Sequence, residues 1–303
     1  MPNRYAVIDL GTNTFHLLIA EQQGTTCFKE LYRQRFFVKL AEEGIQTIGE
    51  KSLKRALEAL ENFRKVLDEF KVKKVSAIGT AALRTASNGQ QLINTIKDKF
   101  DIEVTLIDGK REANLIYKGV RMAVPFEEKN YLLMDIGGGS VEFIIVNKDK
   151  VLWANSFPIG VAVLHKKFHN HEPILPLELQ RLETFIDQIL TPLYQALQQY
   201  PTSILVGASG TFDVLEVILA KDKTKANHAL IDLKNFPPLF NLLISATKEE
   251  RFAMQAIPDT RADMIVVAVV LIKFILQKAD IKEIIVSNYA LKEGVLSELL
   301  FEE

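Results

Sequence analysis

One short pattern occurs twice in this chain, near its start and near its middle. An apolar run ends in Asp9, passes through a turn at residues 11–14 and resumes as a second apolar run. The same order recurs at Asp135, with the turn at residues 137–140. Each copy predicts two strands joined by a tight turn, and the repetition predicts two similar halves with a cleft between them.

The two turns have the composition of phosphate-binding loops. Glycines let the backbone approach a ligand closely and direct consecutive N–H groups into one concavity, and hydroxyl side chains add donors. An ordinary hairpin is the alternative, but the repetition favours a phosphate site. The candidate phosphate-binding residues are Gly11, Thr12, Asn13, Thr14, Gly137, Gly138, Gly139 and Ser140.

The aspartates that precede the turns need a different role, because a carboxylate repels phosphate. Asp9 and Asp135 suit a divalent cation that bridges to the phosphate, or a bound water. Glu142 follows the second turn on the neighbouring strand, so its side chain can reach the same cation. Asp9, Asp135 and Glu142 are therefore the candidate metal ligands.

Each half continues with helices and further strands. Ser52 resembles an N-cap before apolar residues at helical spacing. In the second half, a helix over 177–199 should bend at Pro192. The other expected elements are strands at 74–78, 102–107, 204–206 and 284–287, and helices at 89–100, 239–277 and 291–301.

This order predicts an α/β fold with mixed sheets flanked by helices, present twice. We expect one domain over residues 1–124 and a second over 125–303, joined by the charged stretch after Pro125. The C-terminal segment 288–303 is expected to pack back on the first domain.

Composition excludes several classes of protein. The chain is 48% hydrophobic and 25% charged, as in ordinary globular proteins, and no stretch reaches the roughly 18 apolar residues of a membrane span. The N-terminus enters a strand rather than a signal sequence. A single cysteine, Cys27, fits a reducing compartment, and a net charge of −1 gives no support to nucleic-acid binding. We therefore expect a cytoplasmic protein.

Taken together, these motifs resemble the exopolyphosphatase and guanosine-pentaphosphate phosphohydrolase (Ppx/GppA) family. That family has the duplicated ribonuclease-H-like halves of the actin, sugar-kinase and chaperone-ATPase superfamily. The matching stretches lie in family order at residues 6–19, 79–88, 107–113, 135–142, 158–160, 207–211, 261–263 and 292–294.

The resemblance implies hydrolysis of a terminal phosphoanhydride, in inorganic polyphosphate or guanosine pentaphosphate, with Mg²⁺ and in a homodimer. It implies that Glu112 is the general base and that Arg84 faces the phosphates. Gly210 and Thr211, in the motif at 207–211, are further candidate phosphate ligands. Longer relatives continue into an extra helical domain, so the resemblance does not extend to processive action on long chains.

The sequence departs from the family pattern at Thr12 and Thr14, at Arg111 and at Lys292, and one pair of histidines allows a second interpretation. Arg111 adds positive charge beside Glu112, where the family often has an acidic residue. His165 and His169 lie one helical turn apart, but we expect them on a solvated basic face rather than at a metal. A small-molecule kinase of the same superfamily, and a sensor that binds polyphosphate without turnover, are the alternative functions.

Overall fold

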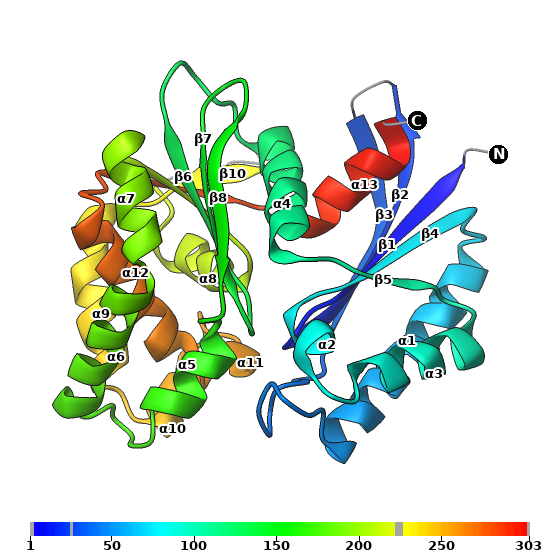
Figure 1. The fold of residues 1–303 in the computed structure, drawn as a ribbon, viewed down its shortest axis with the longest axis horizontal. Helices are drawn as coiled ribbons and strands as arrows, with labels where there is room; N and C mark the ends of the chain where they lie inside the picture. Colours follow the sequence, from blue (N-terminus) through cyan, green and yellow to red (C-terminus); the bar gives the residue numbers. More distant parts are fainter. Residues whose placement is uncertain (1–2, 25–26, 222–226, 302–303) are drawn as a thin grey trace. The chain divides into compact units, whose positions relative to one another are not determined.

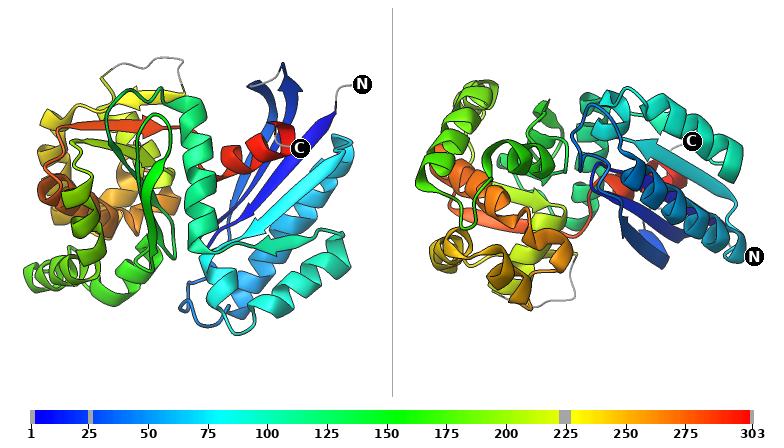
Figure 2. Two further views of the ribbon diagram at one scale, coloured as in Figure 1. Left: turned by 45° about the horizontal axis from the view of Figure 1, so that its top comes forward. Right: turned by 90° about the horizontal axis from the view of Figure 1, so that it is seen from below.

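The computed structural model describes residues 3–24, 27–221 and 227–301, which form two compact units (Figures 1 and 2). The first unit comprises residues 1–119 together with 291–303, and the second comprises residues 120–290. The boundary expected between residues 124 and 125 stays a prediction. Residues 302 and 303 of the expected C-terminal segment lie outside the described residues.

The first unit is built on a five-stranded mixed sheet in the order β3-β2-β1-β4-β5. The first three strands form an antiparallel meander, whereas β4 and β5 run parallel to β1. The strands are β1 (Arg4–Leu10), β2 (Thr14–Gln23), β3 (Cys27–Phe37), β4 (Lys74–Gly79) and β5 (Val104–Leu106). The helices are α1 (Glu50–Glu69), α2 (Ala81–Thr85), α3 (Gly89–Phe100), α13 (Leu291–Phe301) and α4 (Gly109–Ala123), whose residues 120–123 belong to the second unit.

Alternation along β1 decides which side chains enter the core of this unit. Ala6, Ile8 and Leu10 belong to the hydrophobic cluster that α1 and α3 complete. Because successive strand residues point to opposite faces, Asp9 lies on the other face of the sheet. The apolar periodicity of the strand thus keeps this carboxylate out of the core.

The start of α1 differs from the sequence prediction. The helix begins at Glu50 with Gly49 as its N-cap, so Ser52 lies inside the first turn. The Ser52 hydroxyl donates to the Lys39 carbonyl at 2.7 Å instead of capping the helix. Ser52 therefore ties α1 to the segment that follows β3.

The C-terminal helix α13 is part of the first unit and packs tightly against α4. A Cβ on Gly294 would lie 1.8 Å from the Leu115 carbonyl oxygen, so only glycine allows this approach. Glu293 is fully buried and accepts a hydrogen bond from Arg33 of β3 at 2.9 Å. The stretch 292–294 thus contributes to packing and a buried ion pair.

The second unit repeats this plan on a six-stranded mixed sheet in the order β10-β11-β9-β6-β7-β8. Strands β6, β7 and β8 form the meander, and β9 and β11 run parallel to β6. The strands are β6 (Tyr131–Ile136), β7 (Val141–Val146), β8 (Val151–Phe157), β9 (Ile204–Ala208), β10 (His228–Leu230) and β11 (Glu283–Ser287). The two sheets confirm the predicted α/β architecture with its internal duplication.

Helices cover the core face of the second sheet. The hydrophobic cluster joins alternate residues of β6 and β7 to an almost entirely buried helix, α12 (Ile265–Lys278). The other helices are α5 (Val161–Phe168), α6 (Pro176–Ile189), α7 (Thr191–Gln199), α8 (Gly210–Leu219), α9 (Phe236–Ser245), α10 (Lys248–Ala253) and α11 (Asp259–Ala262), with a 3₁₀ turn, η1, at Leu233–Asn235.

The single bent helix predicted over 177–199 is two helices, α6 and α7, separated at Leu190. Pro192 has no N–H to donate to the Gln188 carbonyl, and its ring displaces the preceding turn. The Thr191 hydroxyl donates to that carbonyl at 3.0 Å instead. The proline was the right signal, but it ends the helix rather than bending it.

No helix among the described residues combines the length and apolarity that a membrane crossing requires. The most apolar of them, α12, has 14 residues and is packed in the core of the second unit. This agrees with the absence of a predicted span.

One buried carboxylate makes the stability of the second unit depend on pH. Glu178 in the first turn of α6 accepts backbone N–H bonds from Asn170 and Leu175, each at 3.1 Å, and contacts His171 at 2.9 Å. Burial alone would raise the pKa of Glu178, but these bonds outweigh it and lower the pKa from 4.5 to about 2. A depressed folded-state pKa stabilises the fold above the unfolded-state value, and this contribution is lost as pH falls from about 4.5 towards 2.

We therefore predict that Glu178→Gln lowers the unfolding free energy of the second unit by about 1–3 kcal/mol at pH 7. The difference should shrink below pH 4.5. Trp153, the only tryptophan of the chain, lies on β8, so urea unfolding followed by its fluorescence reports on this unit. Glu183→Gln on the same helix is the control, and a difference that persists unchanged at pH 3 would contradict the assignment.

Candidate active site

The two repeated motifs form hairpin turns with the same backbone geometry. The Gly11 N–H donates to the Thr14 carbonyl at 3.1 Å, and the Gly137 N–H donates to the Ser140 carbonyl at 3.0 Å. In both hairpins the residues on either side of the turn are paired across the strands. The sequence repeat is thus also a repeat of backbone structure.

The first turn is braced by the segment that follows β3. The Leu40 N–H donates to the Thr12 carbonyl at 2.7 Å, and the Val38 and Lys39 N–H groups donate to the Asn13 carbonyl at 3.0 Å. A trans peptide points its N–H away from its C=O, so the N–H groups that follow these carbonyls point away from the brace. Two consecutive donors directed to one side are what an anion requires.

The second turn is braced by the start of α5. The Val161 and Ala162 N–H groups donate to the Gly137 and Gly138 carbonyls at 3.0 and 2.9 Å. By the same peptide geometry, the next two N–H groups of the turn point away from α5. Gly160 makes this packing possible, because its Cβ would lie 2.3 Å from the Gly138 carbonyl carbon.

The carboxylates beside the second turn form an opposed pair. Asp135 on β6 and Glu142 on β7 are directly opposite across the antiparallel strands, so their side chains share a face. Both are buried, with Glu142 only 1% exposed. Two like charges so placed repel each other unless a cation lies near them. The donor set fits Mg²⁺, which prefers carboxylate oxygens.

The equivalent position in the first hairpin has a different partner. Asp9 stands opposite His16 rather than a second carboxylate. A carboxylate and an imidazole attract rather than repel when the imidazole is charged, so this pair does not require a metal. The case for a cation is therefore stronger at Asp135 and Glu142 than at Asp9, and all three metal roles stay predictions.

Ser156 is a site residue that the sequence analysis missed. It lies on β8 opposite Glu142, and its hydroxyl donates to Glu142 Oε1 at 2.6 Å. A serine on the third strand of a meander carries no motif signal. Its contact is visible only once the strand register is known.

Glu112 and Arg84 come together in the first unit although 28 positions separate them in this sequence. The Asp108 carboxylate accepts from the Arg111 N–H at 2.7 Å, which starts α4 and places Glu112 in its first turn. Arg84 Nη1 lies 3.8 Å from Glu112 Oε2 and also donates to the Ile107 carbonyl. The Glu112 side chain is 8% exposed.

These residues share one edge of the first sheet because β1, β4 and β5 are parallel and end at the same side. Asp9 is the penultimate residue of β1, Arg84 follows β4, and Glu112 follows β5. The carboxyl ends of parallel strands are the usual position of active sites in α/β proteins. The fold therefore groups the predicted residues of this unit at a suitable edge.

Arg111 does not lie with Glu112 as the sequence order suggested. Its guanidinium pairs with Glu298 on α13, which also accepts from Lys118 at 2.9 Å. Burial alone would raise the pKa of Glu298, but the bonds from Lys118 and Arg111 outweigh it and lower the pKa. The charge of Arg111 is thus offset within the first unit.

Gly210 and Thr211 begin α8 at the end of β9, the strand beside β6. Ser209 before them has a φ of +70° and a ψ of 173°, a backbone conformation that residues other than glycine rarely adopt. Such strain is typical of functional turns. Arg261 covers Gly210, whose Cβ would lie 1.7 Å from the Arg261 Nη2 atom. Phosphate binding by this turn stays a prediction.

The expectation of a solvated face at His165 and His169 was wrong for His169. Its side chain is fully buried and lies 3.4 Å from Glu172, and His165 is partly buried. Lys166 and Lys167, the lysines between the histidines, are exposed. The helix α5 ends at Phe168, so His169 is turned inward by the chain that leaves the helix.

The structure has two mixed α/β units, each with an aspartate near a strand end and a braced turn beside it. These are features of a class, the proteins of the actin-like ATPase fold that transfer or hydrolyse phosphate. Comparison with known families places the chain within it. The Ppx/GppA phosphatase family matches residues 18–303, and the chain belongs to this family. The resemblance seen in the motifs is thereby confirmed.

Several relatives are similar over nearly the whole chain. A putative exopolyphosphatase of Haemophilus influenzae is 27% identical over 97% of this chain and 90% of its own length. The crystal structure of an exopolyphosphatase from Cytophaga hutchinsonii has 42% identity and a TM-score of 0.94 over 98% of each chain. The Ppx/GppA family member of Aquifex aeolicus has 25% identity and a TM-score of 0.81, over 100% of this chain and 99% of its own.

We predict that Gly160→Ala lowers the phosphatase activity at least about tenfold, because its methyl group would overlap the backbone of the 137–140 turn. Gly49→Ala is the matched control, since its Cβ would meet only the flexible end of Glu43. Phosphate release and the circular dichroism spectrum should be measured for both. Full activity of Gly160→Ala would show that the turn does not need this packing.

Proposed function

We propose that this chain is an exopolyphosphatase that releases terminal orthophosphate from inorganic polyphosphate by Mg²⁺-dependent hydrolysis. The observation that carries the proposal is the opposed pair Asp135 and Glu142 beside a braced glycine turn. This combination suits a cation and a phosphate that bind together. The names of two similar proteins, from Haemophilus influenzae and Cytophaga hutchinsonii, support the choice of substrate.

Asp135 and Glu142 would hold the cation, with Asp9 as a further candidate. When bound, Mg²⁺ supplies neutralisation of the negative charge on the phosphate oxygens. The backbone N–H groups of the two turns, with the hydroxyls of Thr12, Thr14 and Ser140, would orient the chain of phosphates. Gly210, Thr211 and Arg84 are further candidates for contacts with substrate oxygens.

Glu112 is proposed as the general base. Its carboxylate accepts a proton from a water molecule while the water oxygen forms a bond to the terminal phosphorus. The bond between that phosphorus and the bridging oxygen breaks, and the shortened polyphosphate leaves with the electron pair. Arg84 lies 3.8 Å from Glu112 and donates to the Ile107 carbonyl. It would orient the Glu112 carboxylate and approach the phosphates.

The finer parts of the proposal rest on the family resemblance. Guanosine pentaphosphate is the alternative substrate, and a homodimer and a cytoplasmic location are further expectations. The binding of substrate in a cleft between the two halves also stays a prediction. None of these is needed for the hydrolytic chemistry of the named residues.

We predict that Glu112→Gln lowers phosphate release by about 10²–10⁴-fold, since the amide cannot accept the proton. Release should be compared for short polyphosphate, long polyphosphate and guanosine pentaphosphate, each with Mg²⁺. Glu178→Gln is the control, because Glu178 is as buried as Glu112 but belongs to the other unit's α6.

Each outcome decides between functions. Preference for guanosine pentaphosphate would replace the exopolyphosphatase assignment. Formation of ADP from ATP only with an acceptor present would indicate a kinase, and tight binding without release would indicate a sensor. Full activity of Glu112→Gln would remove Glu112 from the mechanism.

We further predict that Ser156→Ala raises the Mg²⁺ concentration for half-maximal activity by about 10-fold or more, because Glu142 loses the hydroxyl that orients it. Activity at saturating Mg²⁺ should recover most of its value. Asn155→Ala is the matched control, since Asn155 is the exposed neighbour on β8. An unchanged Mg²⁺ dependence of Ser156→Ala would argue against a metal at Glu142.

A further inference from the structure

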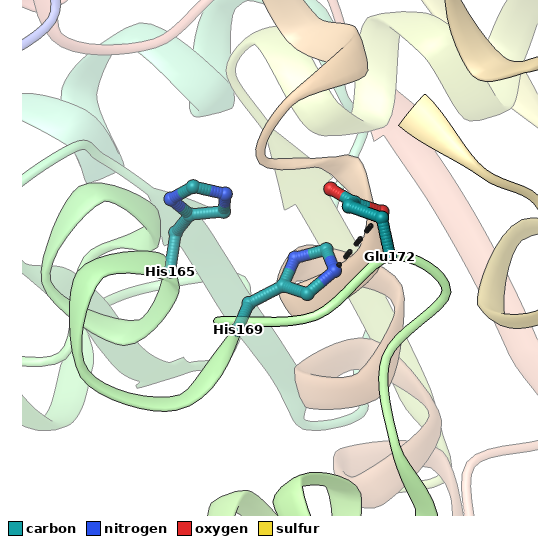
Figure 3. Close-up of side chains that lie close together, drawn as sticks. All are labelled: His165, His169 and Glu172. Atoms are coloured by element: carbon teal, nitrogen blue, oxygen red, sulfur yellow. Dashed lines mark ion pairs between the residues drawn. The ribbon is translucent and has the colours of Figure 1, made fainter. Parts of the chain in front are cut away.

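A second group of ligand-type side chains lies in the second unit, at the end of α5. His165, His169 and Glu172 each offer one ligand atom, and these three atoms lie within 4.8 Å of one another. Figure 3 shows the two imidazole rings and the carboxylate side by side. The group contains none of the residues assigned above to the phosphatase site.

His169 is an unusual buried residue. Its side chain is fully buried, yet neither ring nitrogen has a hydrogen-bond partner among the described residues. Leaving a buried polar atom unsatisfied costs about 1–3 kcal/mol, so buried imidazoles normally have partners. Its ion-pair partner is Glu172, whose Oε2 lies 3.4 Å from His169 Nε2.

The 3.4 Å separation between His169 Nε2 and Glu172 Oε2 can be compared with a hydrogen bond and with two ligands of one metal. It is longer than the N–H···O distance of a usual hydrogen bond, which is about 2.7–3.2 Å. Two ligands bound at about 2.0–2.2 Å to one tetrahedral metal stand about 3.4 Å apart. This pair is thus spaced like one edge of a tetrahedral metal site, and the three ligand atoms together lie within 4.8 Å of one another.

Arg251 holds Glu172 in a fixed orientation. The guanidinium is fully buried and donates to both Glu172 oxygens at 2.7 Å, and also to the Ala246 and Ala262 carbonyls. Each carboxylate oxygen has two lone pairs, so Oε2 keeps one for a further partner. The arginine therefore orients the carboxylate without using up its capacity as a ligand.

The histidines are suited to ligation. Burial lowers the pKa of His165, with a further contribution from the neighbouring His169, and burial also lowers the pKa of His169. Their neutral forms, which are the forms that bind metals, therefore predominate at neutral pH. The rings lie one helical turn apart, with centroids 5.1 Å apart.

The surrounding charges indicate the kind of metal. Glu172 is paired with Arg251, and the nearby Asp263 is paired with Lys248 at 2.8 Å, so these four charges sum to zero. A cation here gains its affinity from coordination by imidazole rather than from net negative charge. Imidazole suits Zn²⁺, Co²⁺ and Ni²⁺, whereas Mg²⁺ and Ca²⁺ depend on carboxylates.

We propose that His165, His169 and Glu172 form a binding site for a divalent transition metal of the Zn²⁺ type, distinct from the proposed Mg²⁺ site. Three protein ligands leave a fourth position for water. The metal joins the end of α5 to the segment before α6, and through Arg251 to α10. Its role is to stabilise the second unit, and it does not depend on the proposed function.

The test is a Co²⁺ titration of the full chain. The protein carries no affinity tag and is first treated with a chelator. Visible absorption of Co²⁺ reports nitrogen ligands, and competition with Zn²⁺ gives its affinity. We expect one equivalent bound, no displacement by excess Mg²⁺, and a melting temperature raised by Zn²⁺. His165→Gln and His169→Gln should each weaken binding at least about tenfold and abolish the thermal shift.

His171→Gln is the matched control, because His171 lies on the same segment, is exposed and is outside the group. It should bind Co²⁺ as the unaltered chain does. Should His169→Gln fail to fold by circular dichroism, the partly exposed His165 carries the same test. The proposal is overturned if the unaltered chain binds no equivalent of Co²⁺, if His165→Gln binds it equally tightly, or if His171→Gln loses it.

Discussion

The candidate site depends on one backbone hydrogen bond that is made twice, from the first glycine of each turn to the carbonyl of its fourth residue. In both hairpins a following segment then takes up the turn's carbonyl groups, which are those of Thr12 and Asn13 in one and Gly137 and Gly138 in the other. Because trans peptides oppose N–H to C=O, this fixes the direction of the remaining donors. The proposed anion binding by the turns would therefore depend on this bracing, and substitutions in the brace should matter as much as those in the turn.

Duplication repeats the backbone but not the chemistry of the side chains. The aspartates keep the same position in the two hairpins, yet one stands opposite His16 and the other opposite Glu142. Only the second arrangement sets two buried carboxylates against each other, which calls for a cation. The first unit contributes instead the pair of Glu112 and Arg84. In the proposed mechanism the two copies have different roles, one in holding a cation and the other in activating water.

The sequence was sufficient where local patterns decide the outcome. The repeated turns and the strands that flank them were predicted, and the α/β architecture is confirmed. The sequence failed where a contact between distant residues decides. Ser52 bonds a carbonyl 13 positions away instead of capping its helix, and His169 turns into the interior. The break at Pro192 is a local effect that the sequence analysis interpreted as a bend. Ser156 could not have been found, because its role follows from strand register alone.

In the proposed mechanism, a water molecule activated by Glu112 attacks the terminal phosphorus of the substrate. The most direct test is a single turnover of short polyphosphate in water labelled with heavy oxygen, followed by mass spectrometry of both products. Attack of water on the terminal phosphorus places one labelled oxygen in each released orthophosphate and none in the shortened chain. Label in the shortened chain, or orthophosphate without label, would contradict it.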